Sequence, residues 1–377
     1  MLDLDENSTA MNKKEQHIEN SDSFRNLKVN KGIADTEDTN RESLKRFKKI
    51  KRKLLSAKEF FEGIKAKNIT ILSQAITLVE SSNPKHQALA DEIINLCLPF
   101  SGESKRIGIT GVPGVGKSTF IENIGLKIVK EGHRLAILAI DPSSEKSKGS
   151  ILGDKTRMED LVKSKDAFIR PSPSSGSLGG VARKTRESII LCEAAGFDII
   201  LIETVGVGQS ETAVHSMTDF FLLLMLAGAG DELQGIKRGI MEMADTIAIS
   251  KADGDNKNKA IVAETEYKNA LHLFPPSNND WETKVLSCSA ITSFGINDLW
   301  KHINDFFILT RKNGALDKKR LNQSKYWMHE SIKEKLMSHL YSNSKYSQLI
   351  EKMENDIIQN KLSPFTAADL IFKEYLS

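Results

Sequence analysis

The feature that most constrains this chain begins at residue 105, where short apolar runs alternate with helical segments. Strands that are buried on both faces of a parallel sheet read as continuous apolar runs of this kind. Their alternation with helices is typical of α/β proteins. The predicted strands are residues 106–110, 135–140, 167–170, 198–202, 220–226, 246–250 and 284–288. We therefore predict an α/β fold with a mainly parallel central sheet covered by helices.

Composition excludes several classes of protein. The chain has 377 residues, of which 40% are hydrophobic, so it is long enough for two or three domains. Its formal net charge of +3 gives no case for nucleic-acid binding. The cysteines, Cys97, Cys192 and Cys288, are odd in number and far apart, which argues against a disulfide framework and a zinc ribbon.

No membrane span and no targeting peptide are predicted. The longest apolar stretch, residues 220–228, is much shorter than the roughly 20 residues that a spanning helix needs. The first residues include Asp3, Asp5 and Glu6, whereas targeting peptides are basic and poor in acids. We therefore predict a cytoplasmic protein.

The chain divides into four predicted regions. Residues 1–44 are polar and almost free of aromatic residues, which predicts a disordered leader. Residues 45–104 form a predicted N-terminal helical cap with helices at 69–79 and 88–98; its basic start, residues 45–53, suits a solvated helix face or an anionic surface. The α/β domain follows over residues 105–311, and residues 312–377 form a helical C-terminal arm.

The arm is predicted from its periodicity. A polar linker is expected over residues 312–319, and Ser363-Pro364 is expected to open a final helix. Between them, an apolar residue recurs every fourth position, at Met328, Ile332, Leu336 and Leu340. So narrow a stripe suits a partner surface, and packing onto the chain's own α/β domain is the alternative.

A phosphate-binding loop follows the first predicted strand. Residues 111–118 read GVPGVGKS, which matches the GxxxxGK[ST] pattern between a strand and a helix. Glycines in such a loop let backbone N–H groups surround a polyphosphate, Lys117 neutralises β- and γ-phosphate oxygens, and Ser118 offers a hydroxyl to Mg²⁺. The predicted phosphate-binding residues are Gly111, Val112, Pro113, Gly114, Val115, Gly116, Lys117, Ser118 and Thr119.

Acidic residues follow two other predicted strands. Asp141 comes directly after the second strand and Glu203 directly after the fourth. Mg²⁺ at phosphate sites is held by one or two such carboxylates, often through water. The segment Glu203-Thr-Val-Gly206 has the form of a Walker B segment with Glu in place of the usual Asp, and Gly206 lets the backbone approach the γ-phosphate.

Two further loops favour guanine over adenine. Ser250-Lys251-Ala-Asp253 resembles the NKxD loop, in which the Asp carboxylate accepts two hydrogen bonds from the guanine edge; Ser250 stands where Asn is usual. Ser289-Ala290, after the seventh strand, matches the loop whose backbone meets the guanine oxygen. The predicted ligand is therefore GTP or GDP with Mg²⁺.

Five longer segments give the chain a family resemblance. They are GITGVPGVGKSTFIE, AIDPSSEKSKGSILGDKTRM, FIRPSPSSGSLGGVARKTRE, ETVGVGQSE and GAGDELQGIKRGIMEMAD. With them the chain, from about residue 68 onwards, resembles the MeaB/ArgK group of P-loop GTPases. The resemblance implies a GTP-hydrolysing chaperone that gates adenosylcobalamin loading and release and protects an acyl-CoA mutase of the methylmalonyl-CoA mutase type. Adenosylcobalamin would be involved only through that partner.

The resemblance also implies residue roles. Asp154 would be a carboxylate on the magnesium side, and Asp141 would act on the attacking water or the metal's water shell, although the two roles could be exchanged. Glu203 would belong to the second switch as a metal-side and catalytic acid, and Lys237 to an extra switch that couples the mutase to hydrolysis. The C-terminal arm would form a homodimer. No Gln follows Gly206 directly, so no residue is assigned to orient water, and we expect slow hydrolysis without the partner.

Other functions remain open from the residues alone. A nickel-inserting metallochaperone GTPase shares the nucleotide loops but usually carries His-rich or Cys-rich segments, which this sequence lacks. A P-loop kinase linked to amino-acid transport would need an acceptor pocket with a base. A scaffold that binds GTP without turnover is the third alternative.

Overall fold

The computed structural model describes residues 54–140, 158–171, 178–204, 210–227, 238–274 and 280–376. The chain separates into two units, Met1–Leu54 and Leu55–Ser377, of which the second is described here. The predicted leader and the basic residues 45–53 lie outside the described residues. Within the described part, no helix is both long and apolar enough to cross a membrane.

A seven-stranded sheet with the order β3-β2-β4-β1-β5-β6-β7 forms the centre of this unit. All its strand pairs are parallel. The strands are β1 (Lys105–Gly111), β2 (Leu135–Ile140), β3 (Ala167–Arg170), β4 (Ile199–Thr204), β5 (Phe220–Leu226), β6 (Thr246–Ser250) and β7 (Lys284–Ser287). The predicted α/β fold is confirmed, and every predicted strand is present.

Burial explains why the apolar runs became strands. All residues of β2 and β4 are buried, and so are nearly all residues of β5. Residues that are buried on both faces carry no period-2 alternation, because neither face meets water. β1 lies between β4 and β5: strands β2 to β4 are on one side of it and strands β5 to β7 on the other. Ligands bind at such a reversal of strand order, beyond the carboxyl ends of the strands, so the loop after β1 is the expected binding position.

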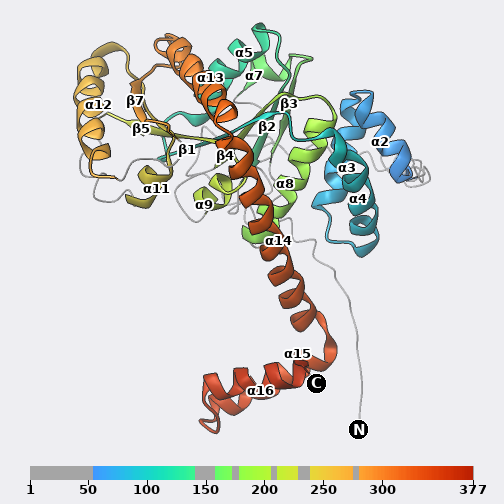
Figure 1. Cartoon of the computed structure of the whole chain (residues 1–377). Coiled ribbons are helices and arrows are strands. Elements are labelled where there is room, and N and C mark those ends of the chain that lie inside the picture. Colours follow the sequence, from blue (N-terminus) through green and yellow to red (C-terminus); the bar gives the residue numbers. More distant parts are fainter. Residues whose placement is uncertain are drawn as a thin grey trace, which may run out of the picture. The chain divides into compact units, whose positions relative to one another are not determined.

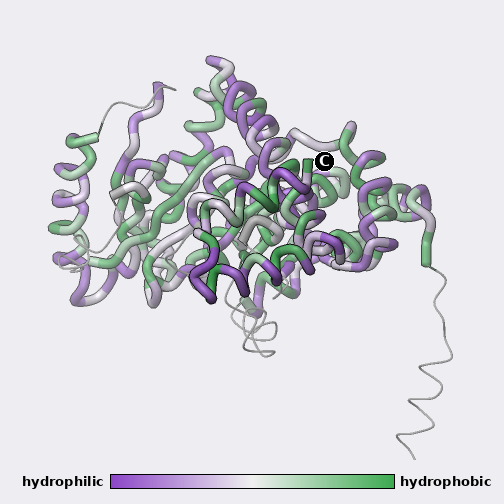
Figure 2. Tube along the Cα trace, turned by 90° about the horizontal axis from the view of Figure 1, so that it is seen from below, coloured by the Kyte–Doolittle hydropathy of each residue, from purple (hydrophilic) through white to green (hydrophobic). Residues whose placement is uncertain are grey.

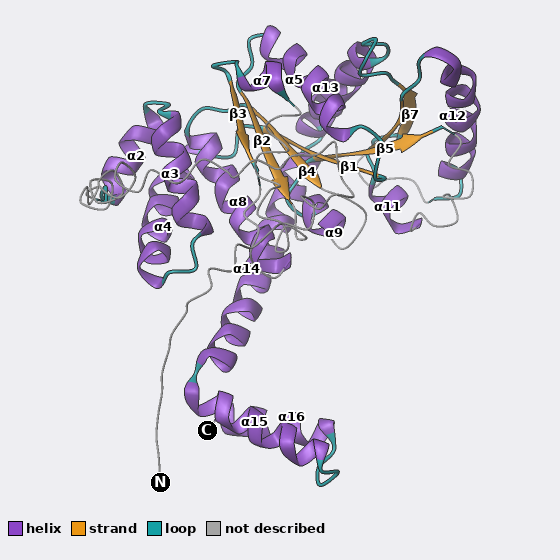
Figure 3. Ribbon diagram, turned by 180° about the vertical axis from the view of Figure 1, so that it is seen from behind, coloured by secondary structure: helices purple, strands orange, loops and turns teal. Residues whose placement is uncertain are grey.

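Helices cover both faces of the sheet (Figures 1 and 3). One face carries α5 (Lys117–Lys130), α7 (Glu159–Val162) and α13 (Ile296–Lys312), and the other carries α8 (Leu178–Ala194), α9 (Ser210–His215) and α11 (Arg238–Met243). A further helix, α12 (Lys257–Leu271), packs against β6 and β7. Hydrophilic and hydrophobic residues alternate along many of the helices (Figure 2), as expected for helices with one face on a core.

The N-terminal helices α2 (Ala57–Lys65), α3 (Ile69–Glu80) and α4 (Pro84–Cys97), followed by the short 3₁₀ helix η2 (Leu98–Phe100), pack together and against α8. The two helices predicted at residues 69–79 and 88–98 are therefore present. α4 begins earlier than predicted because Asn83 caps it and Pro84 occupies its first position. α2 was not predicted, although its capping box, Ser56 with Glu59, can be read from the sequence.

The predicted polar linker over residues 312–319 is wrong. α13 continues to Lys312, and the next helix, α14 (Ala315–Ser342), begins at Ala315. Gly314 makes the turn between them with a φ of +73°, a left-handed conformation that glycine adopts without strain. Polar residues at 315–319 therefore belong to a helix, and a single glycine is sufficient to separate it from α13.

The first part of α14 is anchored to the edge of the sheet where β1 and β5 begin. Arg320 donates to both carboxylate oxygens of Asp219, which directly precedes β5. Gln323 Nε2 donates to the carbonyl oxygen of Thr218 at 2.8 Å, and Trp327 Nε1 donates to that of Ser216 at 3.1 Å. A bidentate Arg–carboxylate pair is among the stronger polar contacts, so this half of α14 is well fixed.

The second part of α14 carries the predicted apolar stripe. Met328, Ile332 and Leu336 are 54%, 48% and 51% exposed, so they do not pack onto the α/β domain. α15 (Ser344–Ile358) and α16 (Pro364–Leu376) follow, and the helix predicted to open at Ser363-Pro364 is confirmed. His339, near the end of α14, contacts the rings of Tyr346 and Tyr375.

We expect His302 to make the fold sensitive to acid. It is 7% exposed on α13, stacks against Trp281 with ring centroids 4.5 Å apart, and its Nε2 has no hydrogen-bond partner among the described residues. Burial lowers the pKa of His302 from 6.5 to about 4; Lys284 also lowers it, and Asp305 raises it. The unfolded chain therefore binds this proton more tightly than the folded chain does. The contribution of neutral His302 to the free energy of unfolding is thus fully present above pH 6.5 and is lost as the pH falls towards 4.

Between pH 7 and pH 4.5 this one group costs about 2.5 kcal/mol of unfolding free energy. His302→Gln, which cannot be protonated, should lose less stability than the unaltered chain by about this amount. Urea unfolding at the two pH values measures it, with His329→Gln on the exposed side of α14 as the control. Equal losses in all three proteins would contradict the assignment.

Candidate functional site: a nucleotide-binding loop and its neighbours

The loop after β1 has the backbone geometry of a phosphate cradle. A Cβ atom at Gly111 would lie 2.5 Å from the carbonyl oxygen of Leu224, so only glycine fits where β1 ends beside β5. Gly114 and Gly116 have φ values of +77° and +90°, in the left-handed region that favours glycine. α5 begins directly after Gly116, so the turn ends at a helix N-terminus, whose free N–H groups favour anions.

Lys117 is the first residue of α5 and bends back over the loop. Its side chain is buried, and its Nζ donates to the carbonyl oxygen of Gly111 at 2.9 Å. Burial lowers the pKa of Lys117, while the nearby carboxylates of Glu203 and Glu211 act in the opposite direction. A buried ammonium group inside the loop is suited to binding the oxygens of a polyphosphate.

The other predicted residues of the loop differ in exposure. Val112 and Val115 are buried and hold the loop against the domain, whereas Pro113 and Thr119 are exposed. Ser118 is half-buried in the first turn of α5, next to Lys117. The predicted phosphate-binding residues thus form one continuous loop and helix start.

Glu203 lies beside the loop at the end of β4. It is 7% exposed and stands opposite Ile109 in the register of β4 with β1. The next residue, Thr204, donates a hydrogen bond from its hydroxyl to that of Thr110 at 2.8 Å. The sheet therefore brings the predicted Walker B acid to the same edge as Lys117.

Two residues at the end of β6, Ser250 and Lys251, hold the loop from the side. The Ser250 hydroxyl donates to the carbonyl oxygen of Val115 at 2.9 Å, and Lys251 Nζ donates to that of Gly114 at 2.8 Å. Lys251 has a φ of +57°, which is uncommon for a residue with a side chain and is often found at functional sites. Ser250, which stands where Asn is usual in an NKxD loop, thus makes a supporting bond to the phosphate-binding loop.

The predicted base-reading residues lie together after β6 and β7. The Ser289 hydroxyl donates to Oδ2 of Asp253, and the backbone N–H of Thr292 donates to the Ser289 hydroxyl at 3.2 Å. The backbone N–H of Ala252 donates to the carbonyl oxygen of Cys288 at 3.0 Å. These bonds fix the Asp253 carboxylate beside Ser289 and Ala290.

Four predicted site residues lie outside the described residues: Asp141, Asp154, Gly206 and Lys237. Two residues that we did not predict belong to the neighbourhood of the site. Glu211, in the first turn of α9, is buried and acts electrostatically on Lys117; its place in the ETVGVGQSE segment was the available signal. Asn123 on α5 contacts Ala290, and nothing in the sequence marks it.

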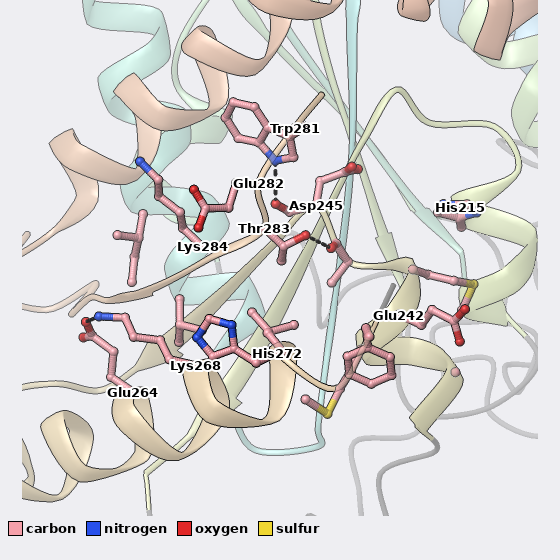
Figure 4. Close-up of a pocket in the computed structure, with 18 of the residues that line it drawn as sticks. His215, Glu242, Asp245, Glu264, Lys268, His272, Trp281, Glu282, Thr283 and Lys284 are labelled. Atoms are coloured by element: carbon pink, nitrogen blue, oxygen red, sulfur yellow. Dashed lines mark hydrogen bonds and ion pairs between the residues drawn. The ribbon is translucent and has the colours of Figure 1, made fainter. Parts of the chain in front are cut away.

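A separate pocket of about 1310 Å³ lies near the start of β6 and β7 (Figure 4). Trp281 Nε1 there donates to the carbonyl oxygen of Asp245 at 2.9 Å. Burial raises the pKa of Asp245. The lining carries both charge signs, including an ion pair between Lys268 and Glu264 at 2.8 Å. Because strands of a parallel sheet all begin at one edge, this pocket lies at the edge opposite the loop after β1.

Comparisons with known proteins agree with this geometry. The family model "Methylmalonyl Co-A mutase-associated GTPase MeaB" matches residues 72–345. GTPase ArgK of Escherichia coli is 46% identical over 295 residues, which cover 78% of this chain and 89% of the relative. The methylmalonic aciduria type A homolog of Mus musculus, named as mitochondrial, is 46% identical over 316 residues, covering 81% of this chain and 76% of the relative.

A solved structure, described as a LAO/AO transport system kinase, superposes with a TM-score of 0.69 at 36% identity. It covers 86% of this chain and all of that one. The family-model match, residues 72–345, spans the sheet, the loop after β1 and the base-side loops described above. The chain therefore belongs to the family of methylmalonyl-CoA mutase-associated GTPases of the MeaB type.

Proposed function

We propose that this chain binds GTP in the loop after β1, hydrolyses it slowly when alone, and uses the cycle to serve an adenosylcobalamin-dependent acyl-CoA mutase. The observation that carries the guanine assignment is the Asp253 carboxylate, which accepts from the Ser289 hydroxyl. Ser250 and Lys251 in the same segment donate to the carbonyl oxygens of Val115 and Gly114. They hold the base-reading segment at a fixed place relative to the phosphate loop. Family membership supports the same assignment.

The residues of the chain divide the work between the two ends of the nucleotide. Backbone N–H groups of residues 111–119 and the Lys117 ammonium group bind the phosphates, and the Asp253 carboxylate accepts two hydrogen bonds from the guanine edge. Hydrolysis of a phosphoanhydride depends mostly on positioning and on neutralising charge. Lys117 supplies that charge where the β- and γ-phosphate oxygens would lie, with Glu203 beside it.

The described donors fit a magnesium ion. The Ser118 hydroxyl and the Glu203 carboxylate are hard oxygen donors at the same edge of the sheet, as Mg²⁺ prefers. Asp141 and Asp154 complete the proposed set. The ion would neutralise phosphate charge; Lys117 and the loop backbone would orient the γ-phosphate.

The partner assignment rests on relatives and on one surface. The family description names methylmalonyl-CoA mutase, and we extend that partner to this chain. The exposed stripe of α14 supports a homodimer formed by residues 312–377, which light scattering on the full chain would test. The gating role, the contribution of Lys237 and a cytoplasmic location belong to the same proposal, although the mouse relative is named mitochondrial.

The function is tested by single-turnover hydrolysis of radiolabelled GTP with and without methylmalonyl-CoA mutase. We expect slow release of inorganic phosphate by the chain alone and an acceleration of at least about tenfold with the mutase. The reason is that a missing water-orienting or cationic group costs about 10³ to 10⁵ in rate, and partner docking can supply part of it. An unrelated protein at the same concentration serves as the control and should leave the rate unchanged.

Two outcomes would contradict the proposal. If the hydrolysis rate is unchanged by the mutase, the mutase is not the partner that stimulates this chain. Transfer of the label to an amino acid or a protein instead of water would favour a kinase, as the description of the similar solved structure says of that protein.

A further inference from the structure

Asn123 links the helix of the phosphate site to a loop of the base site. It lies on α5, the helix that begins with Lys117. Its Nδ2 donates to the carbonyl oxygen of Ala290 at 2.9 Å and to the hydroxyl of Ser293 at 3.0 Å. One amide group thus contacts both ends of the turn formed by residues 290–293.

This turn needs support because its backbone is constrained. Ser293 has a φ of +59°, in the left-handed region that is unfavourable for a residue with a side chain. The backbone N–H of Ser289 donates to the carbonyl oxygen of Phe294 at 2.9 Å and closes the loop at its base. At its tip, Ile291, Thr292 and Ser293 are exposed, so packing contributes little there.

We propose that Asn123 is a positioning residue for the guanine base. By holding the carbonyl group of Ala290, it keeps the backbone N–H groups of the loop directed at the guanine 6-oxygen. It also ties this loop to α5, so that the phosphate end and the base end of the nucleotide are held by one rigid helix. This inference rests on the proposed function.

Asn123 and Asp253 would act on different parts of the base. GDP and inosine diphosphate both carry the 6-oxygen, but only GDP carries the 2-amino group that Asp253 would accept from. Loss of the Asn123 side chain should therefore weaken the binding of both nucleotides equally. Loss of the Ser289 hydroxyl, which donates to Asp253, should weaken GDP more than inosine diphosphate. A general loosening of the fold would not separate the two variants.

The test is the dissociation rate of fluorescent GDP and fluorescent inosine diphosphate from the full chain. Asn123→Ala removes both hydrogen bonds that hold the turn, so its backbone N–H groups are no longer fixed towards the base, and we expect about tenfold faster release of both nucleotides. Ser293→Ala should quicken release less, because it removes one bond. Asn123→Gln keeps the donor group and should therefore release both nucleotides more slowly than Asn123→Ala does. Ser289→Ala should lower the preference for GDP over inosine diphosphate.

Three outcomes would overturn the inference. The first is unaltered release from Asn123→Ala and Ser293→Ala, both shown to be folded by thermal unfolding. The second is a changed ratio between the two nucleotides in Asn123→Ala, which would mean that Asn123 acts through Asp253. The third, no uptake of GDP by the unaltered chain, would overturn the proposed function itself, whereas the first two leave it standing.

Discussion

Replacement of Lys117 by Ala is expected to slow single-turnover GTP hydrolysis about 10³-fold or more. Lys117 is buried within the loop that it neutralises, and its Nζ lies 2.9 Å from the carbonyl oxygen of Gly111. Removing it takes away the positive charge nearest to the phosphates. It also removes a cation that interacts with the buried carboxylates of Glu203 and Glu211, so that their negative charge acts more strongly on the substrate.

Two further variants separate charge from geometry. Lys117→Arg keeps the charge, but its planar, larger head group cannot take the place of a compact ammonium group inside this loop, so most of the loss should remain. Lys130→Ala removes an exposed lysine from the other end of α5 and should retain the unaltered rate. The measurement is release of labelled phosphate under single-turnover conditions. A rate for Lys117→Ala within tenfold of the unaltered chain would refute the assigned role.

The fold could be predicted because its strongest determinants are local in the sequence. Runs such as residues 220–226 are apolar throughout, since β5 lies inside the sheet with helices on both faces. The loop after β1 could be predicted because Gly111, Gly114 and Gly116 each satisfy a backbone demand that another residue would meet only with strain. In both cases the residue type at a position reflects a requirement at that same position: burial for the strand residues and backbone conformation for the glycines.

The rest depended on contacts between distant segments. Asn123 contacts Ala290, 167 residues away, and no local pattern records such a pair. Ser250 departs from the usual Asn, and only its bond to Val115 explains how a shorter side chain serves there. The start of α14 was misplaced because the polar residues after Gly314 read as a linker, whereas Lys319 and Arg320 on α14 are anchored to Asp219.

Replacement of Asp253 by Asn is expected to reduce affinity for GTP at least about 100-fold and to raise affinity for XTP, because a site built around one hydrogen-bond pattern strongly rejects its complement. The carboxylate only accepts, which suits the two donors of the guanine edge; an amide presents an oxygen and an N–H₂ group. The Ser289 hydroxyl already donates to Oδ2, so the amide oxygen of Asn would take that contact. The N–H₂ group would then face the base, where xanthine carries an oxygen in place of the 2-amino group.

Competition by GTP, XTP and ATP for a fluorescent nucleotide measures this exchange. Asp255→Asn is the matched control, because Asp255 is exposed in the neighbouring 3₁₀ helix η4 (Gly254–Asn256) and makes the same change of charge. If both variants lose affinity for GTP to the same extent, a general electrostatic effect is responsible and Asp253 does not contact the base. If only Asp253→Asn gains affinity for XTP, the pair formed by Ser289 and Asp253 recognises the guanine edge. Ser250 and Lys251 then place this reader relative to the phosphates, because each of them bonds to a carbonyl group of the phosphate-binding loop.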